Sequence, residues 1–229
     1  MSLAVDTQYF YDETAVTTLT LDFIPTTERN VAVFNDDEEI DNLAWSVSNN
    51  ILTFDEPQTG DIYVYNYKVV EYTTVKAHLR FFEVYEHTAM AQAHNAAVSF
   101  VEQASGYAMY DRTVTETLVF PTNDCNYQFL SWYKPTLTTV ERFDNQNKAF
   151  VTANATEYTF IDNKPASFYV FMYGNWRLTY SLDSTDYPKT LDHAALLVTA
   201  DLFQNRTSTV KELNSTADML INQVALKMV

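Results

Sequence analysis

The stretch from Tyr187 to Arg206, YPKTLDHAALLVTADLFQNR, constrains the fold of this 229-residue chain more than any other. Its apolar residues recur at helical spacing, and together they form a stripe so wide that little polar surface remains on the helix. The polar exceptions are Asp192, His193, Thr199 and Asp201. Pro188 fits the first helical turn, where its missing N–H would be unpaired anyway. We expect so apolar a helix to lie between other elements or between subunits.

Charge and glycine content exclude several classes of function. The chain has 14 basic and 30 acidic residues, a net charge of −16, so we do not expect it to wrap nucleic acid, which requires basic side chains. It could still line a passage through which DNA slides, or the charge could simply keep the protein soluble. With only three glycines, phosphate-binding glycine loops and dinucleotide-binding patterns are absent.

Cys125 is the only cysteine, so neither an internal disulfide nor a thiolate metal site is expected. The N-terminal residues show no charged-then-apolar signal segment, and no apolar run approaches membrane-spanning length. We therefore expect a protein that is made in a cytoplasm, is not exported by a recognisable signal and does not enter a membrane.

Residues 1–71 show the two-residue alternation of strands. Thr17–Phe23 alternates polar and apolar residues, Val31–Phe34 is a short apolar run, and Ser48-Asn49-Asn50 is a tight-turn signal before Ile51–Phe54. Asp61–Val69 completes the series. We predict a small antiparallel sandwich or barrel for this segment.

From residue 72 the apolar period becomes helical, returns to two between about 113 and 181, and then becomes helical again. A helix over about His87–Ser105 is followed by Gly106, a typical helix stop. The last helix is capped by Asn214 or Ser215. The predicted fold class is α+β: an antiparallel β domain at 1–71, then an α-helical bundle at 72–229 with a β-sheet insert at about 113–181.

No catalytic, cofactor-binding or metal-binding site is predicted. His87 and His94 are seven residues apart on one helix, about 10 Å along its axis, which is too far for joint chelation. We interpret them as helix-surface residues. No serine occurs in a nucleophile-elbow pattern, and the acidic run Asp36–Glu39 lacks the spacing of a calcium loop. These patterns disfavour a hydrolase.

The element order from residue 73 to about 224 resembles that of the head–tail connector, or adaptor, proteins of tailed bacteriophages. Val75–Arg80 matches that family's "vKaHLR" motif letter for letter. Glu102 and Gly106 match "fvE…g" in the second helix, and the Tyr187–Arg206 helix resembles "vP..lk.AillLv…yenR". Matches in the β insert are Trp132, Pro135, Leu137, Val140, Phe143, Tyr158, Leu178 and Tyr180.

This resemblance implies a structural virion protein at the head–tail interface, assembled in the cytoplasm of a host bacterium. Its copies would form a ring, typically a dodecamer, beneath the portal protein. Genomic DNA would pass through the lumen without specific binding, and the far side would be a platform for a stopper or tail protein. The departure from the family is in the last helix, where Asn214-Ser215 replaces the usual preceding proline.

Eight residues are candidates for contacts with the portal or with neighbouring subunits. The last helix carries an apolar stripe suited to a groove, although the same stripe could pack on its own domain. Lys76 and Arg80 could pair with acids of a neighbouring subunit or within one subunit, and Arg206 could bind a carboxylate or terminal carbonyls. The stripe and its basic neighbour comprise Leu220, Ile221, Val224, Lys227 and Met228.

The N-terminal segment is similar to small β modules of phage tail-fibre and neck proteins. The similarity rests on Val31–Asn35, Trp45–Phe54, Pro57, Gly60 and Ile62–Tyr67. Together with the many aromatic residues, it motivates an alternative function: a receptor- or carbohydrate-binding virion module of a neck or fibre. Such a module should expose Trp or Tyr platforms.

Overall fold

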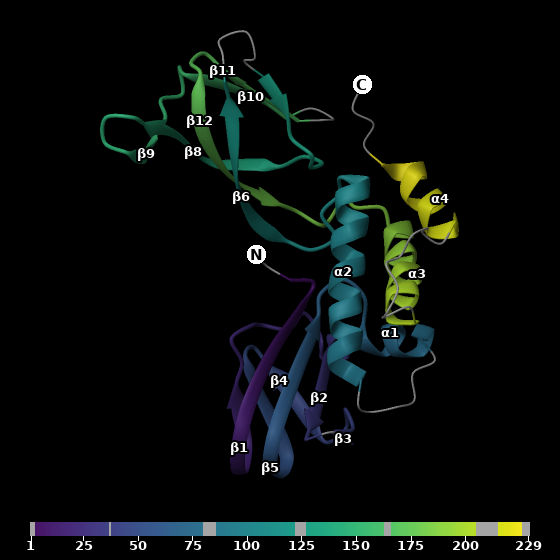
Figure 1. Ribbon diagram of the computed structural model, residues 1–229. Helices are drawn as coiled ribbons and strands as arrows, with labels where there is room; N and C mark the ends of the chain where they lie inside the picture. The colour runs from purple at the N-terminus through teal and green to yellow at the C-terminus, as the bar shows by residue number, and fades with distance from the viewer. Residues whose placement is uncertain are drawn as a thin grey trace. The chain divides into compact units, whose positions relative to one another are not determined.

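The computed structural model describes residues 3–36, 38–79, 86–121, 127–162, 166–204 and 215–225. The chain divides into two compact units (Figure 1). The N-terminal unit comprises Ser2–Val101 and Thr190–Leu220, and the insert unit comprises Glu102–Lys189 and Ile221–Val229. The insert unit therefore interrupts the N-terminal unit in the sequence. The domain boundary between residues 71 and 72 stays a prediction.

In the described part of the N-terminal unit, antiparallel strands form one five-stranded sheet. The central strand, β5, pairs with β1, β2 and β4, while β3 pairs with β2. The sequence suggested two separate strands before and after Pro57, but one strand spans both. The strands are β1 (Val5–Thr20), β2 (Val31–Asn35), β3 (Glu38–Glu39), β4 (Trp45–Ser48) and β5 (Ile51–Tyr67).

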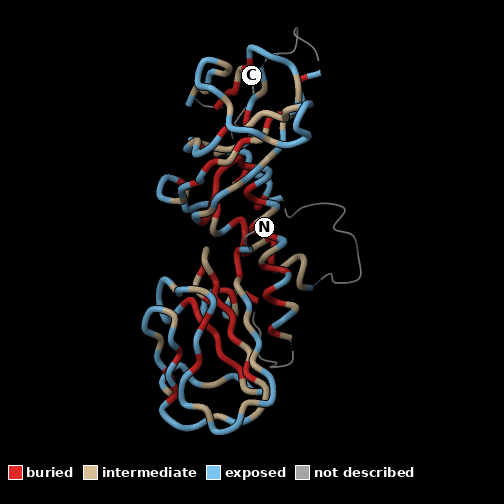
Figure 2. Tube along the Cα trace, turned by 90° about the vertical axis from the view of Figure 1, so that its left-hand side faces the viewer, coloured by how far each residue is buried: buried red, intermediate tan, exposed pale blue. Residues whose placement is uncertain are grey.

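Strand β2 is apolar at successive positions because its two faces meet two different cores. Val31 and Val33 pack in one cluster, whereas Ala32 and Phe34 pack in another. A strand buried on both faces reads as a continuous apolar run, which explains the sequence VAVF. Figure 2 shows buried residues along the strands and exposed residues at their turns. The first core contains Leu19, Leu21, Val31, Val33, Trp45, Leu52, Phe54, Ile62 and Val64.

Strands β1 and β5 bend together, so residues on both sides of the bend, such as Leu52 and Ile62 of β5, pack in the same first core. The pairing register shifts three times between Phe10 and Thr18, and Asp12 and Ala15 have positive φ. Such bulges bend a strand and increase its twist. On the β5 side the bend falls at Gly60, whose φ is +118°. The backbone N–H of Asp61 donates to Asp36 Oδ1 at 3.0 Å across this corner.

Replacing Gly60 by Ala is expected to lower the free energy of unfolding by about 1–3 kcal/mol. A Cβ at this position would lie 2.9 Å from the Asp36 carboxylate, which the Asp61 N–H holds in place. Gly174 is the matched control, because it also has positive φ but its added Cβ would meet nothing within 4 Å. Urea denaturation of both variants measures the difference. Equal losses would contradict a steric role for the corner.

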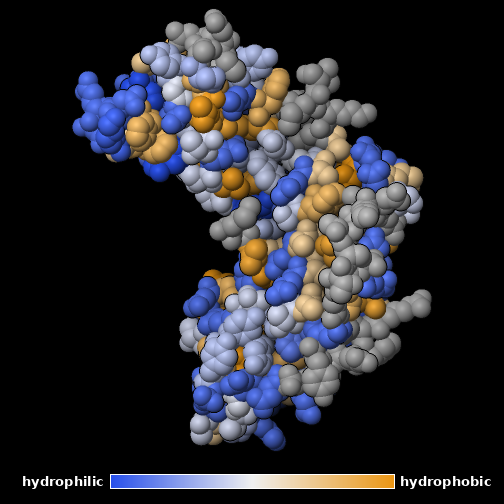
Figure 3. Space-filling view, viewed as in Figure 1, coloured by the Kyte–Doolittle hydropathy of each residue, from blue (hydrophilic) through white to orange (hydrophobic). Residues whose placement is uncertain are grey.

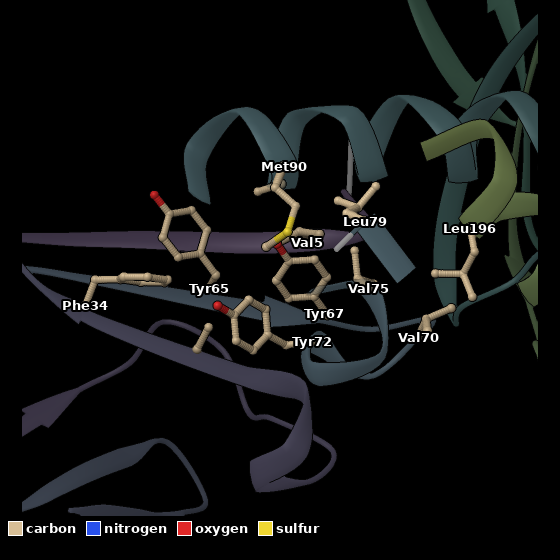
Figure 4. Close-up of a cluster of buried hydrophobic side chains, with 12 residues drawn as sticks. Val5, Phe34, Tyr65, Tyr67, Val70, Tyr72, Val75, Leu79, Met90 and Leu196 are labelled. Carbon is tan, nitrogen blue, oxygen red and sulfur yellow. The ribbon is translucent and has the colours of Figure 1, made fainter. Parts of the chain in front are cut away.

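Helices cover one face of the N-terminal sheet and complete the second core (Figure 1). Val75 and Leu79 of α1 (Tyr72–Leu79) and Met90 of α2 (His87–Ser105) pack there with aromatic strand residues. Figure 4 shows Phe34, Tyr65 and Tyr67 among these helical side chains. The buried members are Val5, Ala32, Phe34, Tyr65, Tyr67, Val70, Tyr72, Val75, Leu79, Met90, Ala91 and Leu196.

The predicted α-helical bundle with a sheet insert is wrong. Strands hold 43% of the described residues and helices 28%, in three antiparallel sheets and four α-helices. The helices were placed correctly by their apolar period, for example α2 at His87–Ser105 with Gly106 at its end. Their partners were not, because an apolar helical stripe shows that a face is buried but does not show what covers it.

The apolar stretch that begins near Pro188 forms α3 (Thr190–Gln204). Leu191, Ala194 and Ala195 are fully buried, and Leu196 enters the core beneath the helices. The helix starts two residues after Pro188, within the usual uncertainty of helix ends. The expectation that this helix lies among other elements is confirmed.

The described part of the insert unit contains two antiparallel sheets around one core. Trp176 and Leu178 of the four-stranded sheet pack with Phe168 and Val170 of the three-stranded sheet, so the sheets face each other. The four-stranded sheet has the order β6 (Arg112–Phe120), β12 (Gly174–Leu182), β8 (Thr136–Asp144) and β9 (Ala149–Thr152). The three-stranded sheet has the order β10 (Tyr158–Ile161), β11 (Ser167–Val170) and β7 (Tyr127–Phe129).

Two short elements complete the described structure: the 3₁₀ turn η1 (Glu28–Asn30) and the last helix, α4 (Ser215–Val224). Asp218 lies in the first turn of α4, where a carboxylate interacts favourably with the helix dipole. None of the described helices is both long and apolar enough to cross a membrane.

Candidate assembly interface

The apolar stripe predicted on the last helix is only partly available to a partner. Ile221 is 3% exposed, whereas Leu220 and Val224 are half-buried. Met219, which the sequence analysis did not select, is 53% exposed. Lys227 and Met228 lie outside the described residues. The portal-contact role of this helix stays a prediction, and Leu220 and Val224 are its accessible described members.

Lys76 forms an ion pair with Glu39 of the same chain. Glu39 Oε2 also accepts a hydrogen bond from the Tyr72 hydroxyl at 3.0 Å, and burial together with this carboxylate raises the pKa of Tyr72. The pair within one chain is the alternative that the sequence left open. The other two basic candidates, Arg80 and Arg206, lie outside the described residues.

The histidines of α2 do not lie on the helix surface, so that interpretation was wrong. His87 is 6% exposed and stacks on Phe34 with ring centroids 4.1 Å apart. His94 is fully buried, and its Nδ1 lies 3.1 Å from Thr199 Oγ1 on α3. The Thr199 hydroxyl donates to the carbonyl of Ala195, so we assign the imidazole N–H to His94 Nδ1. Burial lowers the pKa of His94 to about 4.

A buried ion pair joins the end of α2 to the start of β6. Arg112 donates to both carboxylate oxygens of Glu102, at 2.6 and 2.8 Å, and the two side chains are 9% and 4% exposed. The backbone N–H of Met109 also donates to Glu102, at 2.7 Å. The Arg112 guanidinium lies over the rings of Tyr110 and Trp132. This arrangement fixes the chain where it enters the insert unit.

The negative charge of the chain is not balanced by a basic patch in the described ranges. Seven basic side chains there form ion pairs with acids, so most of the described positive charge is already neutralised. Binding to a nucleic-acid backbone requires clustered basic side chains. The described surface therefore lacks the electrostatic footprint of a nucleic-acid-binding protein.

The described residues do not form a metal site: no three His, Cys, Asp or Glu side chains among them are close enough to hold an ion. The N-terminal unit has a cavity of about 380 Å³ beside η1, β2 and the start of α1. Its walls include Glu28, Glu39 and Asp41 together with Trp45 and Tyr72. Glu39 is already engaged by Tyr72 and Lys76, so this cavity does not present a set of free convergent groups.

The outward face of the three-stranded sheet is rich in exposed aromatic rings. We define the aromatic face as Tyr127, Phe129, Tyr169 and Phe171. In the register of β11 and β7, Tyr169 lies opposite Tyr127, and their rings stack with centroids 5.5 Å apart. Tyr127, Phe129 and Phe171 are 48%, 41% and 65% exposed. The sequence analysis missed this face, although the uninterrupted apolar run Phe168–Tyr173 was a signal of it.

No protein-family model matches the sequence, and no curated protein matches it significantly. Solved structures do share the fold. A chain in the neck of an empty gene transfer agent (GTA) particle, computed with C6 symmetry, matches with a TM-score of 0.54 and 15% identity. The match covers 70% of this chain and 91% of that chain.

Two further structural neighbours come from native GTA particles. A chain in the virion of the native particle has a TM-score of 0.51 and 15% identity, over 70% of this chain and 91% of that chain. A chain in the native neck, computed with C12 symmetry, has a TM-score of 0.50 and 14% identity, over 69% of this chain and 88% of that chain. The structural neighbours are therefore neck and virion proteins of a gene transfer agent. At these identities the likeness shows the fold.

Proposed function

We propose that this protein is a head–tail adaptor of a phage-like particle. Its copies form a ring beneath the portal, extend the DNA channel and provide a platform for a stopper or tail protein. The observation that carries the proposal is the fold shared with neck chains of GTA particles, over 70% of this chain. The symmetric assemblies of those neighbours, C6 and C12, support a ring, and we propose a dodecamer.

The mechanism is assembly rather than catalysis. Subunits that bury faces against one another close into a cyclic ring. With a net charge of −16, the chain would repel the DNA backbone, so genomic DNA would pass through the lumen without specific binding. The portal would be contacted by the last helix, through Leu220, Val224 and the residues that follow. The protein would act in the virion, at the head–tail interface, after assembly in the host cytoplasm.

Co-expression with the portal protein encoded in the same genome tests this proposal. Purification through a tag on the portal, followed by electron microscopy, should show a closed ring of this chain stacked on the portal ring. Val224→Asp should weaken that stacking, because it places a charge on the helix proposed to meet the portal. Gln223→Glu, at a neighbouring exposed position, is the matched charge control. A chain that does not co-purify, or that lies elsewhere in the particle, would refute the adaptor role.

The alternative is a receptor- or carbohydrate-binding module of the virion. One observation favours it: Tyr127 and Tyr173 are 48% and 64% exposed, and exposed tyrosine rings are the platforms that such a module requires. Binding of soluble glycans to the purified chain, measured by isothermal titration calorimetry, would support this alternative over the adaptor.

A further inference from the structure

We propose that the aromatic face is the surface through which neighbouring copies of this chain contact one another. This inference rests on the proposed ring. It names the surface of each subunit that contacts the next subunit in that ring. Figure 3 shows hydrophobic side chains at the surface of the insert unit. The aromatic face comprises residues of β7 and β11 and Phe171 just after β11, with β7 at the edge of its sheet.

The aromatic rings point away from a core that is already complete without them. In β11, Phe168 and Val170 are 0% and 2% exposed and belong to the core of the insert unit. Tyr169 occupies the alternate position of β11, which faces the other way, and Phe171 follows directly after the strand. An antiparallel sheet with one solvated face normally carries polar residues there. An outer face with four aromatic rings is therefore unusual for a surface that stays in water.

The charge of the chain determines where two copies can touch. Each copy has a net charge of −16, so two copies would repel each other if they met through most parts of their surfaces. The outward positions of β7, β10 and β11 carry Thr159, Ile161 and Ser167 beside the rings. Glu157, which lies opposite Phe171 just before β10, is already paired with Arg142. A face whose neighbouring carboxylate is already paired lets such a chain bury apolar surface against another copy with little repulsion from this side.

Complementary charges are less suited to join the copies. The described basic residues of the four-stranded sheet are largely occupied, because Arg142 pairs with Glu157 and Arg177 with Glu141. The pKa of Glu141 is lowered by the hydrogen bonds from Arg177, which keeps this acid charged and paired. Among the described residues of this unit, few positive groups thus remain to attract the acids of a neighbour.

A sugar fits the aromatic face less well than a second copy does. A sugar hydroxyl needs hydrogen-bonding side chains around the ring on which the sugar stacks, whereas phenylalanine has none. Two of the four rings belong to Phe129 and Phe171. The outward polar residues of the described strands are Thr159 and Ser167, and Ser167 is only 5% exposed.

The area of the face agrees with a contact between ring subunits. A fully covered aromatic side chain buries about 150–250 Å². Tyr127, Phe129 and Phe171 are about half exposed and Tyr169 is half-buried, so together the rings offer roughly 250–400 Å². A stable interface buries about 800 Å² per partner. The face would therefore be the apolar centre of a larger contact. In a closed ring it would meet a different surface of the next copy, since head-to-tail contacts generate rings.

The double substitution Phe129→Asp and Phe171→Asp in the full chain tests the inference. Sedimentation velocity from low to high micromolar concentration should show association of the unsubstituted chain. The double variant should have a dissociation constant at least about 30-fold higher, the size expected for the loss of a central aromatic contact. Its circular dichroism and thermal midpoint should stay unchanged. Ile24→Asp with Leu43→Asp, at residues 71% and 83% exposed, is the matched control and should associate like the unsubstituted chain.

Each result of this experiment is decisive. Association of the double variant equal to that of the unsubstituted chain would overturn the inference, as would glycan binding that the double variant loses without any change in association. If the unsubstituted chain associates only on the portal, the double variant must fail to form that ring. Portal-bound rings formed equally by the double variant would sink this inference but leave the adaptor role standing. Association that depends on the aromatic face but never occurs at a portal would support this inference and refute the adaptor role.

Discussion

Replacing Glu102 by Leu is expected to lower the free energy of unfolding by about 3–5 kcal/mol, the usual result of breaking a buried ion pair from one side. The substitution leaves the Arg112 guanidinium charged, 9% exposed and without its two hydrogen bonds. It also removes the acceptor of the Met109 N–H. Urea denaturation at neutral pH measures the loss.

Two further variants test whether this loss of stability comes from the unpaired buried charge on Arg112. Glu102→Leu combined with Arg112→Leu should recover much of the stability, because it leaves no unpaired buried charge. Lys134→Leu removes one partner of an exposed pair, with Asp186, and should have little measurable effect. If the double variant is less stable than Glu102→Leu, the ion pair contributes more than the avoidance of a buried charge.

Acidification is expected to destabilise the N-terminal unit through His94. The pKa of His94 is about 4 in the folded chain and about 6.5 in an unfolded chain. The unfolded state therefore binds the proton first, so stability is complete above pH 6.5 and falls as the pH decreases from 6.5 toward 4. The total loss over that window is about 3 kcal/mol, because the charged imidazole must form among buried side chains. Denaturation midpoints measured at several pH values give this profile.

The difference between variants isolates the contribution of His94 from that of the carboxylates. His94→Leu should have a flatter profile between pH 6.5 and 4 than the unsubstituted chain. His193→Gln replaces an exposed histidine of α3 and should retain nearly the full dependence. A His94→Leu profile parallel to that of the unsubstituted chain would show that His94 does not take up the proton on unfolding.

Local patterns in the sequence predicted many elements of this fold. The strand at Val31–Phe34 and the helix at His87–Ser105 were predicted within a residue or so of their observed bounds. Gly106 ends that helix with φ +78° and an N–H that donates to the carbonyl of Glu102. These features depend on the period of a short segment and on one backbone conformation, both of which a single sequence displays.

The packing partners of these elements could not be predicted in the same way. The helices were assigned to a bundle, yet Met90 packs with Tyr65 and Tyr67 of a strand. His94 was assigned to the surface because its spacing from His87 does not suit a metal site, and its buried partner, Thr199, is more than 100 residues away in the sequence. Long-range pairing of this kind has no local signal, so a helical stripe or a lone polar residue leaves its surroundings open.

In the candidate interface, too, local features were predicted from the sequence and long-range packing was not. The sequence identified the amphipathic last helix, and half-buried Leu220 and Val224 remain available on it. It missed the aromatic face, because Tyr127 and Tyr169 lie side by side only through the pairing of β7 with β11. An apolar run too long for one buried face, as in Phe168–Tyr173, is the signal that finds such surfaces.

The pairing of β1 with β5 has a consequence for how the chain is made. Val5 pairs with Tyr67 and Thr20 with Ile51, so a nascent chain leaving the ribosome has its first strand exposed until its partner has been translated. Such distant pairing is slow to form, and a waiting strand is prone to aggregate. Polar residues along β1, among them Asp6, Gln8 and Glu13, would keep this waiting segment soluble while the remainder of the sheet is synthesised.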